Sequence, residues 1–199
     1  DARWVAADCS KEEDIHRLAD ESLQRLGDID ILVNNAGAAW GAPAEDHPLD
    51  AWDKVMNLNV RSYFILSQLV AKRSMIARKR GSIINTASIA GLGGNPRDMK
   101  TIAYNTSKGA VINFTRALAG EWGEHGITVN ALAPGYTHTE FSQAKDPEFN
   151  AFVSGWTPAR RWGQPEDLCG AALLLASGAG AYINGQTLYV DGGFLAVTR

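Results

Sequence analysis

Short apolar runs alternate with longer amphipathic stretches along the chain. The apolar runs are predicted strands, at residues 4–9, 30–33, 81–88 and 127–133. The longer stretches carry apolar residues at helical spacing, at residues 10–26, 49–78 and 105–122. Strands that alternate with helices are typical of an α/β fold, in which helices cover both faces of a parallel sheet.

Three of the predicted strands run directly into residues that suit ligand binding. The strand at residues 30–33 leads into Asn34-Asn35-Ala36-Gly37, and the strand at residues 127–133 leads into Pro134-Gly135. Ser88 ends the third strand, before a glycine-rich loop. Ligands bind outside the carboxyl ends of parallel strands, so we expect a binding site at this edge of the sheet. The alternative for Ser88 is a serine that only ends its strand.

Tyr104 and Lys108 lie one helical turn apart in a predicted helix. Residues at positions i and i+4 share a helix face, so their side chains can converge on one point. A phenol has a reference pKa of about 10, and a neighbouring cation favours the phenolate and lowers that pKa. The spacing therefore predicts a proton-transfer pair, and the alternative is a chance pairing on an exposed helix face.

Several motifs occur together in one order and resemble the short-chain dehydrogenase/reductase family over essentially the whole chain. They are Asn34-Asn35-Ala36-Gly37, Asn59, Ser88, Tyr104-x-x-x-Lys108, Asn130, Pro134-Gly135 and the segment at residues 185–193. The resemblance implies a three-layer, doubly wound, Rossmann-like parallel sheet. It also implies hydride transfer between NAD or NADP and a secondary alcohol or ketone.

The resemblance assigns catalytic roles to four residues. Tyr104 would be the general acid in reduction and the general base in oxidation, and Ser88 would polarise the same substrate oxygen. Lys108 would lower the pKa of Tyr104 and hydrogen-bond the nicotinamide ribose. Asn59 would hold a water that passes protons to Lys108, and Asn57 is the nearby alternative.

The resemblance also assigns cofactor contacts to residues at the predicted strand ends. Asp8 and Cys9 would contact adenine, although Asp8 also suits a helix N-terminus, because Ser10 and Glu13 have the spacing of a capping box. The ribose and nicotinamide contacts would be Asn34, Ala36, Gly37, Tyr104, Lys108, Pro134, Gly135, Thr137 and Thr139.

Residues 1–199 are expected to be a single Rossmann-like domain that lacks the first two strands of the family fold. No glycine-rich phosphate loop of the form G-x-x-x-G-x-G occurs before Asp8. The first strand seen here, residues 4–9, would then have no partner strand on one side, which leaves an unprotected sheet edge. The residue that distinguishes NAD from NADP lies at the end of the second strand in this fold, so the preference stays open.

Several aromatic residues either follow the strand-end motifs or fall in a predicted lid at about residues 137–161. The candidates for substrate contact are Trp40, Tyr136, His138 and Trp156, with Phe141 and Phe152 in the same group. Packing at a subunit contact is the alternative. A loop at residues 95–100 is longer than the family spacing and would lie beside the substrate pocket. The sequence around residues 41–43 and 159–167 is similar to the gluconate 5-dehydrogenase branch and to 3-oxoacyl carrier-protein reductases. The substrate can therefore be a sugar acid, a polyol or a 3-oxoacyl group, and the sequence does not decide among these classes. It also does not decide the direction of the reaction.

Composition and cysteine content indicate the class of protein and its compartment. With 45% hydrophobic residues, 21% charged residues and a net charge of −3, the chain suits one core and gives no reason to expect nucleic-acid binding. Two distant cysteines and no His/Cys ligand cluster favour a cytoplasmic protein without a metal site. We also expect no membrane span, and the resemblance implies a homotetramer. The alternative function is a catalytically silent nucleotide-binding or scaffold subunit.

Overall fold

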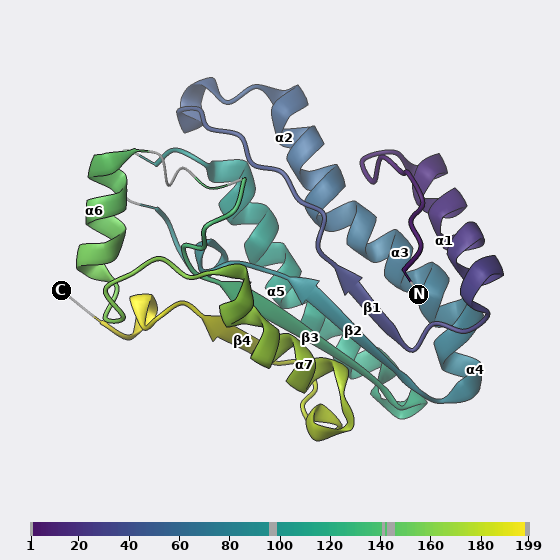
Figure 1. Cartoon of the computed structure of the whole chain (residues 1–199). Helices are drawn as coiled ribbons and strands as arrows, with labels where there is room; N and C mark the ends of the chain where they lie inside the picture. The colour runs from purple at the N-terminus through teal and green to yellow at the C-terminus, as the bar shows by residue number, and fades with distance from the viewer. Residues whose placement is uncertain (1, 96–98, 141, 143–145, 198–199) are drawn as a thin grey trace.

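Three of the four apolar runs, together with residues 187–190, form a four-stranded parallel sheet. The computed structural model describes residues 2–95, 99–140, 142 and 146–197. The strands lie in the order β1-β2-β3-β4, with β1 at one edge, and are β1 (Ile31–Asn34), β2 (Gly81–Thr86), β3 (Ile127–Pro134) and β4 (Thr187–Val190). All three pairings are parallel, so the carboxyl ends of the strands meet at one edge of the sheet (Figure 1). This arrangement confirms the predicted α/β class.

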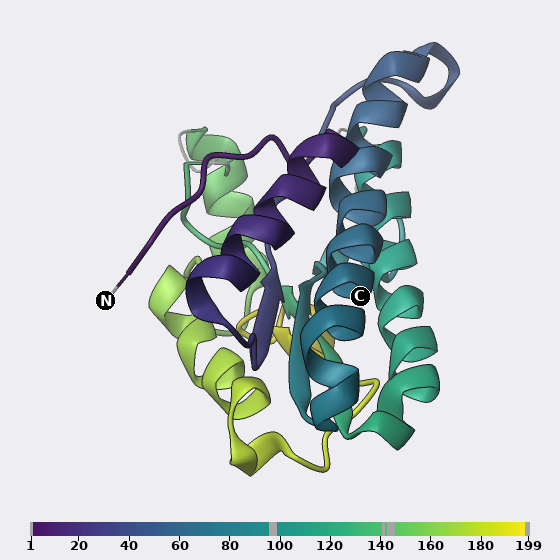
Figure 2. The same cartoon turned by 90° about the vertical axis from the view of Figure 1, so that its right-hand side faces the viewer.

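Helices cover both faces of the sheet, as the doubly wound fold requires. Figure 2 shows α3 and α5 on one side of the strands and α7 on the other. The helix α1 packs beside α3. The helices are α1 (Glu12–Leu26), α2 (Leu49–Met56), α3 (Ser62–Val70), α4 (Ile76–Arg78), α5 (Ile102–Trp122), α6 (Pro147–Trp156) and α7 (Cys169–Ala176). None of the described helices is long and apolar enough to cross a membrane.

The predicted strand at residues 4–9 is not formed. The segment has no strand partner in the described part of the chain, and it runs alongside α1 instead. Its backbone carbonyls accept hydrogen bonds from α1 side chains: Arg25 donates to Trp4 O at 3.1 Å and Arg17 donates to Ala6 O at 2.7 Å. A backbone that lacks a ladder partner satisfies its polar groups in this way.

The predicted capping box at Ser10 and Glu13 is also wrong. The first helical residue is Glu12, and the N-cap, Lys11, makes no side-chain capping bond. The Ser10 hydroxyl and amide both donate to the Asp8 carboxylate, at 2.7 and 3.0 Å. The hydroxyl is therefore a donor to Asp8 and not an acceptor from the helix.

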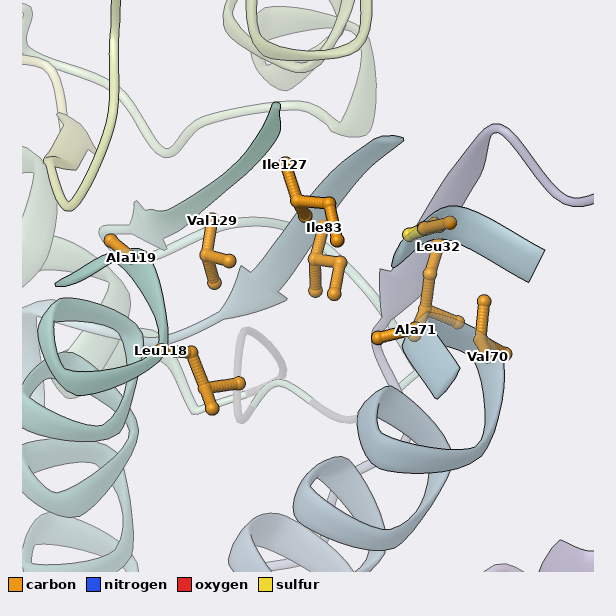
Figure 3. Packing of buried hydrophobic residues seen from close by; sticks show 9 residues of the cluster. Leu32, Val70, Ala71, Ile83, Leu118, Ala119, Ile127 and Val129 are labelled. Atoms are coloured by element: carbon orange, nitrogen blue, oxygen red, sulfur yellow. The ribbon is translucent and has the colours of Figure 1, made fainter. Parts of the chain in front are cut away.

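A row of apolar residues crosses the sheet and forms the centre of the main core. Leu32, Ile83 and Val129 are register partners on adjacent strands and pack against α3 and α5 (Figure 3). On the opposite face, Ile84 of β2 and Leu175 of α7 belong to another cluster. Neighbouring residues in a strand point to opposite faces, so a single apolar run supplies both clusters.

The predicted amphipathic stretch at residues 49–78 is helical throughout but not regular. Two π-helical segments interrupt it, at Asn57–Arg61 and Ala71–Met75. Asn59 lies in the first segment and is fully buried, while Asn57 is exposed. A π-bulge is a common feature of functional sites because it changes the direction of a side chain locally.

We expect Ile83→Ala to lower the free energy of unfolding by about 2–5 kcal/mol, because it creates a cavity in a close-packed core. Ile83 is 0% exposed. Urea denaturation measures the change. The control Leu26→Ala, at a side chain that is 62% exposed, should change stability by less than about 1 kcal/mol. Equal losses in the two variants would contradict this account of the core.

Candidate active site

The helix α5 carries Tyr104 and Lys108 against the carboxyl end of β2. Lys108 is only 3% exposed, and its ammonium Nζ donates to Thr86 O at 2.6 Å. The same Nζ lies 5.6 Å from the centroid of the Tyr104 ring and 5.8 Å from that of Tyr63. The i, i+4 spacing thus places the cation beside the phenol, in a site largely closed to solvent.

Burial shifts both titrating groups toward their neutral forms. Desolvation lowers the pKa of Lys108 to about 8. Desolvation also raises the pKa of Tyr104, and this effect outweighs the hydrogen bond with the Ser88 side chain, which lowers it. The Lys108 ammonium donates to Thr86 O, and the lowering of the Tyr104 pKa by Lys108 stays a prediction.

Ser88 and Tyr104 bring two hydroxyl groups together from separate elements. Ser88 follows the end of β2 and is 9% exposed. Its side chain is hydrogen-bonded to that of Tyr104, and its Oγ also accepts from the amide of Ala90 at 3.1 Å. Two adjacent hydroxyls can contact a single carbonyl or alcohol oxygen.

Asn59 connects the loop after β1 to α5. Its Nδ2 donates to Ala38 O and to Ser107 Oγ, both at 2.9 Å, and its Oδ1 accepts from the amide of Ala38 at 2.8 Å. Ser107 in turn donates to Tyr104 O at 2.7 Å. The side chain is therefore fixed from both sides. Gly37 adjoins it, since a Cβ there would lie 3.4 Å from Asn59 Oδ1 and 3.8 Å from Lys108 Nζ.

A small cavity lies where we expect the adenosine part of the cofactor. Its volume is about 140 Å³, and three of the expected cofactor residues, Cys9, Asn34 and Ala36, are in its lining together with Tyr63. Burial raises the pKa of the Cys9 thiol. Asp8 does not line the cavity; it is exposed and accepts hydrogen bonds from Ser10.

Asn34 differs from the expected ligand contact in one respect. Its side chain is 3% exposed and donates to Ser67 Oγ at 3.0 Å and to Asn85 Oδ1 at 2.8 Å. The amide hydrogens of Asn34 are thus used within the core. The side-chain amide hydrogens of Asn34 are therefore not available to a nucleotide, and a contact would have to use its other atoms.

The expected nicotinamide contacts lie at and after the end of β3. Pro134 is the last residue of the strand, and the amide of Gly135 donates to Val190 O at 3.0 Å. Thr137 forms an isolated bridge with Gly163, whereas Thr139 is exposed. Among the described residues, no group of three or more His, Cys, Asp or Glu side chains is placed to hold a metal ion.

The aromatic residues expected in the lid form one cluster beside this loop. The Tyr136 ring contacts Trp162 at a centroid distance of 5.6 Å, and His138 stacks on Trp162 at 5.0 Å. Trp156 lies in the same cluster through Phe194. Trp40 is 45% exposed and makes no ring contact with this cluster among those that the structure describes. Phe141 and residues 96–98 of the long loop lie outside the described residues.

Sequence reasoning missed several residues that organise the site. Ser107 bridges Asn59 and Tyr104, and Tyr63 donates its hydroxyl to Ala36 O at 3.0 Å. Ser107 lies inside the Tyr-x-x-x-Lys motif, three residues after Tyr104, so helical spacing could have identified it. Tyr63 had no such signal, because an aromatic residue in an amphipathic helix is usually a core residue.

The structure brings Ser88, Tyr104 and Lys108 together at the carboxyl ends of the strands of an α/β fold. A family model described as enoyl-(acyl carrier protein) reductase matches residues 1–195. The chain belongs to the short-chain dehydrogenase/reductase family and is an oxidoreductase. Both the fold class and the family resemblance read from the sequence are confirmed.

Individual relatives are similar over nearly the whole chain. The 2-dehydro-3-deoxy-D-gluconate 5-dehydrogenase of Escherichia coli (strain K12) is 42% identical over 194 residues, which cover 96% of this chain and 76% of that protein. The rhamnolipids biosynthesis 3-oxoacyl-[acyl-carrier-protein] reductase of Pseudomonas aeruginosa is 40% identical, covering 98% of this chain and 77% of that protein. The crystal structure of a gluconate 5-dehydrogenase from Burkholderia cenocepacia J2315, in complex with NADP and tartrate, matches with a TM-score of 0.90 and 40% identity, covering 96% of this chain and 74% of that one.

The lowered pKa of Lys108 predicts a pH dependence of stability. In the unfolded chain Lys108 has a pKa near 10.5 and is protonated between about pH 8 and pH 10.5, whereas in the folded chain it has lost its proton in this range. Stability therefore rises with pH wherever the unfolded state holds more protons. Each pKa unit corresponds to about 1.4 kcal/mol, so the free energy of unfolding of the wild type should rise by about 3 kcal/mol relative to Lys108→Met between pH 8 and pH 10.5.

Urea denaturation of both proteins at several pH values measures this difference. Lys108→Met also removes the hydrogen bond to Thr86 O, but that loss shifts the stability difference by a constant amount. Parallel curves for the two proteins would mean that Lys108 keeps an ordinary pKa.

Proposed function

We propose that the chain catalyses hydride transfer between a nicotinamide dinucleotide and a secondary alcohol or ketone, with Asn59, Ser88, Tyr104 and Lys108 as its catalytic residues. The observation that carries this proposal is the convergence of the Ser88 and Tyr104 hydroxyls beside the buried ammonium of Lys108. The family membership and the names of the relatives support the reaction class.

Each residue has a distinct task. In reduction Tyr104 donates its phenolic proton to the substrate oxygen, and its raised pKa keeps that proton in place at neutral pH. Ser88 donates a second hydrogen bond to the same oxygen and stabilises its developing negative charge. Lys108 stabilises the phenolate left on Tyr104, and Asn59 holds the loop at Ala38 against α5. In oxidation the same residues act in reverse.

We propose NAD or NADP as the cofactor. The cavity lined by Cys9, Asn34, Ala36 and Tyr63 would take its adenosine part, which fits because the cavity lies on the same side as the Asn-Asn-Ala-Gly loop. The bound nucleotide supplies or accepts the hydride. Two of the similar solved structures contain NADP, which supports a nucleotide of this kind.

For the substrate we propose a sugar acid of the gluconate type. Similar proteins named as gluconate or 2-dehydro-3-deoxy-D-gluconate 5-dehydrogenases support this class, at 42–45% identity. The second candidate is a 3-oxoacyl thioester, because the Pseudomonas aeruginosa reductase is similar over 98% of this chain. We place the activity in the cytoplasm, since both cysteines are free.

The test of the proposed function is the variant Tyr104→Phe in the full-length protein. It removes the transferred proton and should reduce kcat by about 100-fold or more. Nicotinamide absorbance is followed with NAD or NADP against sugar acids, polyols and 3-oxoacyl thioesters. Tyr182→Phe is the matched control, because Tyr182 is fully exposed, and its kcat should stay at the wild-type value.

A different outcome would support the alternative function. Nucleotide binding without turnover of any substrate in the panel would indicate a catalytically silent subunit. Turnover that is equal in the wild type and in Tyr104→Phe would contradict the assignment of Tyr104.

We further propose a homotetramer in which α3 and α5 form one subunit contact. Phe64 on α3 is 44% exposed and makes an edge contact with Phe114 on α5, at a centroid distance of 6.4 Å. This places an apolar aromatic pair on α5, which carries Tyr104 and Lys108, and on α3, which follows the π-helical segment with Asn59. Apolar surface of this kind commonly marks a protein interface.

Light scattering after size-exclusion chromatography should give a mass four times that of the subunit. Phe64→Glu introduces a charge into the proposed contact and should shift the protein to smaller species. Leu26→Glu, at an exposed residue that ends α1, should leave the tetramer intact. A monomeric wild type would contradict the proposal.

A further inference from the structure

Asn105 is the residue after Tyr104, and its side chain makes four hydrogen bonds to residues that follow Ser88. Its Nδ2 donates to Ala90 O at 3.0 Å and to Gly93 O at 2.9 Å. Its Oδ1 accepts from the Thr101 hydroxyl at 2.9 Å and from Asn95 Nδ2 at 3.1 Å. A side-chain amide has two donor hydrogens and one oxygen with two lone pairs, so its hydrogen-bonding capacity is fully used.

The same loop contacts α5 at a second point, one turn further along. A Cβ on Gly91 would lie 2.7 Å from the backbone carbonyl of Lys108, so only glycine permits this approach. The Ser88 Oγ caps the short turn between these contacts by accepting from the amide of Ala90. The residues that follow Ser88 therefore contact α5 at two points after Tyr104, at the Asn105 side chain and at the Lys108 backbone.

We propose that Asn105 is a positioning residue that sets the spacing between the Ser88 and Tyr104 hydroxyls. The inference rests on the proposed function, in which both hydroxyls contact one substrate oxygen. Ser88 follows the end of β2 and Tyr104 lies in α5, so their separation depends on how the described residues between them are held. Asn105 makes four hydrogen bonds that hold it.

The geometry also explains why a side-chain amide is used at this position. Ala90 O and Gly93 O are acceptors, while Thr101 and Asn95 offer donors. A short side chain that both donates twice and accepts is needed to join them, and Asn meets this requirement. A displacement of about 1 Å in an active site can lower the rate by about 100-fold. Hydrogen bonds made one residue from Tyr104 can therefore change kcat through the position of its hydroxyl.

The test compares Asn105→Ala in the wild-type background and in the Ser88→Ala background. Asn105→Ala introduces no charge beside Tyr104. We expect kcat to fall by about 10- to 100-fold in the wild-type background, with KM for the nucleotide unchanged. In the Ser88→Ala background the same substitution should change kcat by less than about 3-fold, because residues that act through one another are not additive. Asn113→Ala, at an exposed asparagine on the same helix, is the matched control and should leave kcat unchanged.

The pH profile separates positioning from a loss of folded protein. The hydrogen bond from Ser88 lowers the pKa of Tyr104. Asn105→Ala should weaken that bond and move the Tyr104 inflection in kcat/KM for oxidation to higher pH. A purely structural role would lower the amplitude of the profile and leave its inflection in place. Thr101→Val, which removes one hydrogen bond to the same amide, should shift the inflection in the same direction by a smaller amount.

Two results would overturn the proposal. One is an equal loss of kcat in both backgrounds, which would place the effect of Asn105 outside the Ser88–Tyr104 pair. The other is an unchanged inflection in both Asn105→Ala and Thr101→Val. Failure of the proposed function would give a different result. In that case the turnover of the wild-type protein would be the same as that of Tyr104→Phe.

Discussion

The burial of Lys108 at the end of β2 is the constraint on which the rest of the site depends. An ammonium group taken out of water is strongly destabilised unless it is hydrogen-bonded, and here Thr86 O accepts from it at 2.6 Å. This bond fixes α5 against the sheet and so fixes the position of Tyr104. The close approach of Gly91 to the Lys108 backbone is possible only because glycine has no side chain. One buried cation thus sets the geometry of strand, helix and loop together.

A chain of buried polar side chains extends this constraint into the core. Asn34 and Asn85 are register partners on β1 and β2, and Asn34 donates to Asn85 Oδ1 at 2.8 Å. Asn85 donates to Thr115 on α5, and Asn34 also donates to Ser67 on α3. Removal of one partner would leave a buried polar group without a hydrogen bond, at a cost of about 1–3 kcal/mol. These pairs therefore disfavour other strand registers and helix positions.

Much of the fold and the central part of the site could be predicted from the sequence, because both follow from local patterns. The strands and helices gave clear periodicities, and the strand-end motifs identified the edge of the sheet at which the candidate residues lie together. The prediction failed where a residue's role depends on long-range neighbours. Residues 4–9 have a strand-like sequence but no strand partner, and the Ser10 hydroxyl bonds to Asp8 and not to the helix. Asn105 looked like any residue within the motif, since its four partners come from a loop whose path the sequence does not reveal.

The charges in the site show how one geometry can act in both directions. Burial moves Lys108 and Tyr104 toward their neutral forms, with the lysine pKa lowered to about 8 and the tyrosine pKa raised. At neutral pH Tyr104 therefore keeps the proton that it would donate in the proposed reduction, while Lys108 is still charged. Oxidation by the proposed mechanism would require the phenolate, which a rise in pH favours, but the same rise neutralises the Lys108 ammonium that would stabilise it. The two groups thus oppose each other above about pH 8. Contacts that lower the Tyr104 pKa without adding buried charge, such as the Ser88 hydrogen bond, would therefore favour the oxidative direction of the proposed reaction.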